Sequence, residues 1–159
     1  MQQLVFDPSK VMNISITERT GYHAELEALR ASRRTLKELA YTPSLPDRGY
    51  NDRTLYVNVE TLEVQEKPVT QQMKDIFIGG RGFGLWHLWH AVTAKTRWND
   101  PENEIIISPG PVCGITQYAG TGKSLVVSLS PQTDIPIDSN VGGYFGPLLK
   151  FSGFDALEL

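Results

Sequence analysis

Glycine is distributed very unevenly along this chain of 159 residues, and this constrains the fold more than any other feature. Of the 14 glycines, only Gly21 and Gly49 lie in the first half, and the others lie between Gly79 and Gly153. Glycine adopts backbone conformations that other residues avoid, and it lets main-chain atoms approach a ligand closely. The second half is therefore expected to contain either a main-chain binding surface or tight turns between short strands.

Composition limits the classes of protein to which the chain can belong. Fifteen Lys and Arg against 18 Asp and Glu give a net charge of −3, which argues against a general nucleic-acid binder. No apolar run approaches the roughly 20 residues that span a bilayer, and the first ten residues do not resemble a signal peptide. We therefore expect a cytoplasmic protein without membrane insertion. The single cysteine, Cys113, excludes an internal disulfide and a cysteine-rich metal site within this chain.

The chain divides into an extension, residues 1–50, and a domain, residues 51–159. Residues 20–40 combine many charged side chains with leucines at helical spacing, which predicts an amphipathic helix. Residues 41–51 are rich in Pro, Gly and Asp and are interpreted as a linker or loop. The polar face of the helix could instead meet RNA or a membrane surface, but packing on a neighbour is the favoured interpretation.

The domain is expected to have an α+β fold that is rich in β-sheet. Alternation of apolar and polar residues predicts a hairpin with strands at 55–60 and 63–67. Further strands are expected at 104–108, 124–130 and 155–159, and helices at 85–96 and 146–151. Glycine-bearing loops are expected at 109–122 and 139–145.

Two glycine motifs resemble nucleotide-binding loops but depart from them. Residues 120–124, G-T-G-K-S, resemble the end of a P-loop. The first glycine of that motif would fall on Gln117, and strand-forming residues follow the lysine where a helix should begin. A lysine beside main-chain amides remains suited to holding an anion. G-G-R-G-F-G, residues 79–84, lacks the third glycine of a dinucleotide fingerprint and predicts a glycine-rich helix entry. Arg81 could reach an anion or the carbonyls of a neighbouring element.

Histidine and cysteine give weaker signals. His87 and His90 have a spacing that can place two imidazoles on one metal ion, but structural histidines in an aromatic helix are the favoured interpretation. Cys113 is expected to be a buried thiol, because a nucleophile would need a basic partner and none is evident. N-V-G-G-Y-F-G, residues 140–146, could present main-chain groups to a large planar or phosphorylated ligand.

Several segments are informative through their order and spacing. These are G-R-G at 80–82, D-P-E-N-E-I-I-I at 100–107, P-G-P-V-C-G at 109–114, S-L-S-P-Q-T at 128–133, N-V-G-G-Y-F-G at 140–146 and L-K-F-S-G-F-D at 149–155. Together they resemble the N-terminal domain of the tungsten-dependent aldehyde:ferredoxin oxidoreductases over about residues 53–159. That family also contains the active-site subunit of tungsten-type benzoyl-CoA reductase.

The resemblance implies a β-sheet-rich domain that cradles a tungsten bis-pyranopterin cofactor. In the family, an arginine contacts the pterin near an iron–sulfur cluster, and its position falls on Lys123. Lysine keeps the positive charge but lacks the bidentate hydrogen-bonding fork of the guanidinium group. Asn140 falls on an asparagine whose carbonyl helps hold a magnesium ion between the pterin phosphates. Gly142 falls on a glycine whose main chain lies against the pterin, and Gly143 is expected to permit the same close approach. No catalytic residue is assigned in this chain.

The family enzymes are much longer than this chain. The resemblance therefore implies a small subunit or fragment, completed by a larger polypeptide that carries the cysteines of a [4Fe-4S] cluster. The expected reaction is oxidation of an aldehyde to a carboxylate, with electrons passed to ferredoxin or a similar carrier. Two alternatives remain open: low-potential reduction of an aromatic acyl-CoA, and a non-catalytic assembly or binding protein that keeps the fold. The amphipathic helix of the extension is a candidate docking element for the larger polypeptide.

Overall fold

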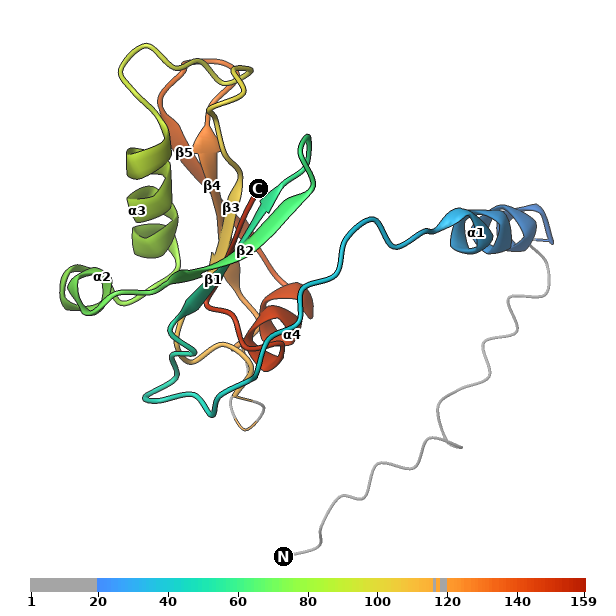
Figure 1. Ribbon diagram of the computed structural model, residues 1–159, viewed down its shortest axis with the longest axis horizontal. Helices are drawn as coiled ribbons and strands as arrows, with labels where there is room; N and C mark the ends of the chain where they lie inside the picture. The colour runs from blue at the N-terminus through green and yellow to red at the C-terminus, as the bar shows by residue number, and fades with distance from the viewer. Residues whose placement is uncertain (1–19, 116, 118–119) are drawn as a thin grey trace, which may run out of the picture. The chain divides into compact units, whose positions relative to one another are not determined.

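A mixed six-stranded sheet organises the C-terminal unit of the chain (Figure 1). The computed structural model describes residues 20–115, 117 and 120–159, so the first 19 residues of the expected extension lie outside the described residues. The chain forms two compact units, Met1–Leu36 and Lys37–Leu159. The sheet order is β2-β1-β6-β3-β4-β5, with β1 and β6 parallel and all other neighbours antiparallel. The expected α+β fold is confirmed.

The strands are short, and most lie close to the predicted positions. They are β1 Arg53–Asn58, β2 Glu63–Pro68, β3 Ile106–Pro109, β4 Ser124–Leu129, β5 Pro136–Val141 and β6 Ala156–Glu158. The predicted hairpin is confirmed as β1 and β2. Its turn is closed by Asn58, whose side-chain oxygen accepts hydrogen bonds from the main-chain N–H groups of Glu60 at 3.0 Å and Thr61 at 2.9 Å. A side chain that satisfies turn amides in this way fixes the register of the two strands.

Helix α3, Arg81–Ala91, packs along one face of the sheet (Figure 1). At Gly84 an added Cβ would lie 2.9 Å from Cβ of Val127, so glycine lets the helix approach β4 directly. The core beneath α3 consists of buried aliphatic residues, namely Leu88, Ile106, Val127, Leu129 and Ala156. A second cluster, Val69, Met73 and Phe83, packs where α2, Gln71–Ile76, meets α3.

The predicted bounds of the second-half helices and loops need correction. The helix expected at 85–96 spans Arg81–Ala91 instead. It begins earlier because Gly79 and Gly80 take positive φ angles that form the turn before it, and it ends where Val92 becomes extended. Helix α2 was not predicted, although Thr70 caps it by accepting a hydrogen bond from Met73 N at 3.2 Å. The loop expected at 139–145 begins only after Val141, because residues 136–141 pair with β4 as an edge strand.

Helix α4, Phe145–Phe151, is tied to the sheet by a buried ion pair between Lys150 and Asp155. Asp155 also accepts hydrogen bonds from the main-chain N–H groups of Asn51, at 2.9 Å, and Asp52, at 2.8 Å. The Tyr41 hydroxyl donates to the main-chain oxygen of Ser152. Residues 41–52 therefore contact the sheet unit, although part of this segment was assigned to the extension. The expected boundary between residues 50 and 51 stays a prediction.

In the N-terminal unit, helix α1 spans Thr20–Ser32 and is shorter than the predicted 20–40. Its last turn is closed by the Ser32 hydroxyl, which donates to the main-chain oxygen of Leu29 at 2.8 Å. Continuing the helix would place Arg34 four residues after Arg30, and like charges at this spacing are unfavourable. Across the described residues, no helix is both long and apolar enough to cross a bilayer.

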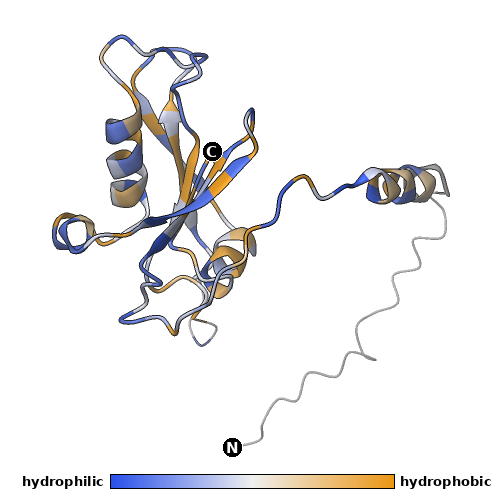
Figure 2. Ribbon diagram, in the orientation of Figure 1, coloured by the Kyte–Doolittle hydropathy of each residue, from blue (hydrophilic) through white to orange (hydrophobic). Residues whose placement is uncertain are grey.

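The sheet face opposite α3 carries an open row of aliphatic side chains. Cross-strand registers align Leu55, Leu157, Ile107 and Val126 across four neighbouring strands. All four are only half-buried, and Ile137 on β5 is 51% exposed. Hydrophobic residues run along the central strands and α4 in Figure 2. An apolar sheet face of this extent is normally covered by another layer of structure.

Candidate functional site: a pocket built by glycine loops

A pocket of about 320 Å³ lies at the N-terminal end of α3, where the turn before this helix meets the loop between β3 and β4. We call it the glycine pocket, because main chain at Gly79, Gly80, Gly110 and Gly120 forms part of its wall. Its other lining residues are Ile78, Arg81, Pro111, Val112, Cys113, Thr121, Lys123 and Leu125. The first glycine motif and the loop before β4 are thus brought together, as a shared ligand surface would require.

The turn before α3 needs glycine at two successive positions. Gly79 has φ +144° and Gly80 has φ +54°, values that side chains disfavour. Gly80 N donates to Pro109 O at 3.1 Å, which fixes this turn against the loop after β3. No side chain caps α3 at Gly80, so the positive end of its helix dipole lies at the pocket.

Lys123 supplies a positive charge at the same pocket. The β4–β5 register pairs Ser124 with Val141, so the residues just beyond these strands face one another. An added Cβ at Gly142 would lie 3.2 Å from Nζ of Lys123, and one at Gly122 would lie 2.6 Å from the main-chain oxygen of Gly143. The two glycine loops therefore pack directly against each other, and the lysine side chain crosses the space that Gly142 leaves.

Arg81 is held in place by a carboxylate from β5. Its Nε lies 2.9 Å from Oδ1 of Asp138, and a terminal guanidinium nitrogen donates to Oδ2 at 2.9 Å. This paired geometry fixes the guanidinium while its side chain stays 62% exposed. Of the two partners that the sequence left open for Arg81, an anion or neighbouring carbonyls, the observed one is anionic, namely the Asp138 carboxylate.

Cys113 lines the glycine pocket but is only 7% exposed. Burial raises the pKa of its thiol, against a smaller lowering effect of Lys150. A raised pKa keeps the thiol protonated, and the nucleophile in cysteine chemistry is the thiolate. The expectation of a buried, unreactive thiol therefore agrees with its surroundings.

Three of the predicted cofactor-binding residues come together, and the fourth lies apart. Lys123, Gly142 and Gly143 meet at the junction of the two glycine loops, although only Lys123 lines the pocket. Asn140 is exposed on β5, opposite Leu125, which does line the pocket. Roles in cofactor binding remain predictions for all four residues.

The two histidines on α3 have separate structural roles. His87 is buried, and its Nε2 lies 3.1 Å from the hydroxyl oxygen of Thr54. His90 is exposed, and its Nδ1 lies 2.7 Å from the main-chain oxygen of Trp86. Within the described ranges, no group of three or more His, Cys, Asp or Glu side chains is arranged to hold a metal ion.

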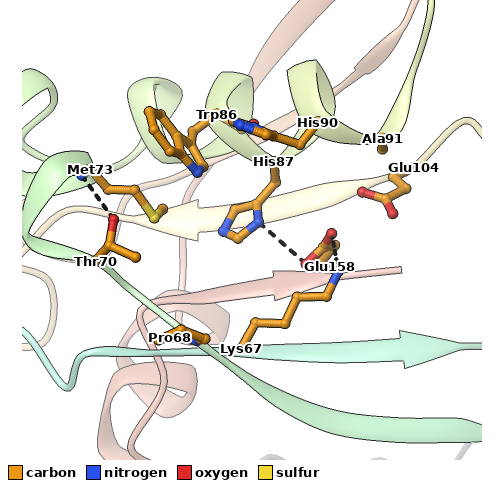
Figure 3. Close-up of a pocket in the computed structure, with 10 residues that line it drawn as sticks. All are labelled: Lys67, Pro68, Thr70, Met73, Trp86, His87, His90, Ala91, Glu104 and Glu158. Carbon is orange, nitrogen blue, oxygen red and sulfur yellow. Dashed lines mark hydrogen bonds and ion pairs between the residues drawn. The ribbon is translucent and has the colours of Figure 1, made fainter.

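A second cavity contains buried carboxylates that the sequence analysis missed. It has a volume of about 370 Å³, and we call it the carboxylate pocket (Figure 3). Its lining residues are Lys67, Pro68, Thr70, Met73, Trp86, His87, His90, Ala91, Glu104 and Glu158. The sequence feature that could have located Glu158 is the alternation along β6. Glu158 follows the buried Ala156 by two positions and therefore lies on the same face of the sheet.

Comparison with known proteins identifies the family. Residues 54–159 match the family model described as the aldehyde ferredoxin oxidoreductase N-terminal domain. The sheet with its glycine pocket thus corresponds to the N-terminal domain of a class of oxidoreductases. The chain belongs to the aldehyde ferredoxin oxidoreductase family, as the sequence resemblance indicated.

Individual relatives agree with this assignment. The tungsten-containing aldehyde ferredoxin oxidoreductase of Thermococcus kodakarensis is 39% identical over 105 residues, which cover 66% of this chain and 17% of that protein. The enzyme of the same name from Pyrococcus horikoshii is 35% identical over 109 residues, which cover 69% of this chain and 18% of that protein. An aliphatic sulfonate oxidoreductase WOR-like subunit of Pyrococcus furiosus is 32% identical, covering 69% of this chain and 18% of that subunit.

A solved structure has the same fold. It is the active-site complex BamBC of benzoyl coenzyme A reductase with 1,5-dienoyl-CoA, with a TM-score of 0.65 and 27% sequence identity, covering 69% of this chain and 17% of that chain. The chain thus spans about a sixth of the length of the curated relatives and of this structure.

Proposed function

We propose that this chain forms one wall of the cofactor cradle in a tungsten bis-pyranopterin oxidoreductase that is completed by a larger polypeptide. The reaction is oxidation of an aldehyde, in which aldehyde and water give carboxylate, three protons and two electrons, with the electrons passed to ferredoxin or a similar carrier. When bound, the cofactor supplies the two-electron chemistry, and the protein positions it and tunes its electrostatics. This chain contributes binding groups and no acid or base.

The glycine pocket is the observation that carries this proposal. Main chain from the turn before α3 and from the loop between β3 and β4 forms part of its wall, and the N-terminus of α3, which no side chain caps, and Lys123 lie at the same pocket. Helix N-termini and lysine side chains both stabilise phosphate groups. A pterin phosphate would therefore meet favourable charge at this wall.

The residues present fit part of a large pterin cofactor. The Lys123 side chain lies against Gly142, whereas no heavy atom lies within 4 Å of an added Cβ at Gly143, so the main chain at Gly143 is accessible to a flat ligand. A cavity of about 320 Å³ lies at the low end of the range for small-molecule sites, and a bis-pterin would need a second wall. We assign Lys123 to the phosphates, Gly142 and Gly143 to close main-chain contact, and the Asn140 carbonyl to magnesium.

The open row of aliphatic side chains supports the larger polypeptide as partner. Four strands present aligned apolar residues on the face away from α3, and α4 adds Leu148 and Phe151, which are 59% and 64% exposed. Exposed apolar surface of this kind is typical of interfaces. The partner would carry the [4Fe-4S] cysteines, since this chain has only Cys113.

One second function is favoured by a specific observation. The similarity to the benzoyl coenzyme A reductase complex supports a role in reducing an aromatic acyl-CoA, with the same glycine pocket holding the cofactor. Assaying the native assembly with both substrate classes separates the two reactions. A non-catalytic assembly protein, the remaining alternative, would contain no tungsten or only sub-stoichiometric tungsten.

The proposal is tested by replacing Lys123 in the native assembly. Lys123→Ala is expected to lower both tungsten content and released pterin per protein, whereas Lys123→Arg retains them because the charge is kept. Lys95→Ala, at an exposed lysine outside the pocket, is the matched control. Wild-type tungsten and pterin content in Lys123→Ala would show that the assigned role is wrong.

A further inference from the structure

The carboxylate pocket contains two buried carboxylate oxygens without a hydrogen-bond donor. The Glu158 side chain is only 3% exposed, and its Oε1 accepts a hydrogen bond from Nζ of Lys67 at 2.7 Å. Its Oε2 lies 3.3 Å from Nδ1 of His87. Yet among the described residues neither this Oε2 nor Oε2 of Glu104 accepts a hydrogen bond. Buried polar atoms nearly always have a partner, so these two oxygens require a donor.

The cationic and imidazole groups that line the cavity each have a partner already, which for Lys67 and His87 includes Glu158. Lys67 bonds Glu158 and lies with Nζ 3.8 Å from the centre of the Tyr56 ring. His87 Nε2 lies beside the Thr54 hydroxyl, and His90 Nδ1 lies beside the Trp86 carbonyl. The described residues offer no set of three or more ligating side chains for a metal ion, as noted above. Below a pH of about 8 the proton on Glu104 can be shared with Glu158, but once Glu104 loses this proton the two oxygens lack a donor, which a bound ligand could then supply.

Aromatic rings line the same cavity as the acidic groups. The rings of Trp86 and His90 have their centroids 4.7 Å apart, and both residues line the pocket from α3 (Figure 3). A planar cation stacks well on such rings, and a guanidinium group presents its N–H donors as a rigid fork that matches carboxylates. A volume of about 370 Å³ leaves room for this group.

We propose that the carboxylate pocket binds a guanidinium group, which donates hydrogen bonds to the unpartnered oxygens of Glu104 and Glu158 and packs against Trp86 and His90. The group comes either from an arginine side chain of a partner polypeptide or from a free guanidino compound. This site shares no lining residue with the glycine pocket, so the inference does not depend on a tungsten cofactor.

Binding at this site is coupled to a proton. Burial and the nearby Glu158 carboxyl raise the pKa of Glu104 to about 8, so Glu104 is mostly protonated at neutral pH. The charged and titratable groups that line the cavity with it are Lys67 on β2, His87 and His90 on α3, and Glu158 on β6. A guanidinium must displace the Glu104 proton to gain a full carboxylate partner, so its affinity rises as the pH rises through about 8.

The test is an NMR titration of the full 159-residue chain with methylguanidinium, following the indole N–H signal of Trp86. Saturable binding is expected at pH 9, with affinity about a hundredfold weaker at pH 6 because one proton must be released. Tetramethylammonium at equal ionic strength is the control probe, since it is a cation without N–H donors. Glu104→Gln is expected to weaken binding at pH 9 by about tenfold or more and to abolish its pH dependence. Glu102→Gln, which removes an exposed carboxylate nearby, leaves both unchanged.

The same titration in the native assembly distinguishes the two sources. Binding in the isolated chain but not in the assembly identifies a partner arginine as the occupant, and binding in both identifies a free guanidino compound. The proposal is overturned by an absence of saturable binding at pH 9 in the isolated chain, by an equal response to tetramethylammonium, or by wild-type affinity in Glu104→Gln. None of these results depends on tungsten content, so failure here is distinct from failure of the proposed function.

Discussion

At the scale of single residues, the molecule places like charges close together in a buried site. Glu104 and Glu158 line one cavity, and the environment drives their pKa values apart. For Glu158, burial alone would raise the pKa, but His87 and Lys67 outweigh it and lower the value to about 2. For Glu104, burial and Glu158 act together and raise the pKa to about 8. The pair therefore carries close to one negative charge near neutral pH.

This difference predicts a stability profile with pH. Glu104 has a raised pKa in the folded state, so its contribution is present in full below its ordinary value of 4.5 and is lost as the pH rises through about 8. The contribution of Glu158 is present above 4.5 and is lost as the pH falls through about 2. We expect Glu104→Gln to gain stability relative to wild type between pH 5 and pH 9, measured by urea denaturation. Glu102→Gln is the control, and parallel profiles for wild type and Glu104→Gln would contradict the assignment.

At the scale of elements, the contact between α3 and β4 depends on a glycine. Gly84→Ala would place a methyl group 2.9 Å from Cβ of Val127, so we expect a loss of about 1–3 kcal/mol of unfolding free energy from overpacking. Gly110→Ala is the matched control, since no heavy atom lies within 4 Å of its added Cβ. Urea denaturation of both variants measures the difference. Equal stability of the two would mean that α3 can shift on the sheet without cost.

Patterns among neighbouring residues predicted those helices and strands that depend on short-range sequence. The β1–β2 hairpin follows from the alternation along residues 55–60 and the return strand at 63–67. The glycine-rich run at 79–84 predicted a helix entry, but the helix begins at Arg81 and not at Leu85. Strand β5 was missed because its exposed residues show no alternation, and only pairing with β4 defines it. The predicted first helix was longer than α1, because the spacing of leucines does not show which residues they would contact.

The sites were predictable to different degrees for the same reason. Glycine spacing and the family resemblance pointed to Lys123 and the two glycine loops, which do lie together. The pairing of Glu104 with Glu158 and of Lys150 with Asp155 was not predictable. The Glu104–Glu158 contact depends on tertiary packing between segments far apart in the sequence, and a charged residue in isolation predicts a solvated surface.

At the scale of the whole molecule, the chain leaves an apolar sheet face open. If the larger polypeptide covers this face, Ile137→Glu should prevent assembly while changing the stability of the isolated chain by less than about 0.5 kcal/mol, since the side chain is already 51% exposed. Ile76→Glu is the matched control, because Ile76 is 56% exposed on α2. Co-purification of the larger polypeptide with each variant is the measurement. Undiminished assembly with Ile137→Glu would show that the partner binds elsewhere.

In the proposed assembly, main chain from the glycine loops forms a wall of a tungsten-pterin site. The most direct test of this arrangement is the tungsten and pterin content of the assembly purified from its native source without oxygen. We expect tungsten and a bis-pterin in stoichiometric amount with this chain, together with a larger polypeptide that carries a cysteine cluster. A natively purified protein with no tungsten and no pterin would contradict this arrangement.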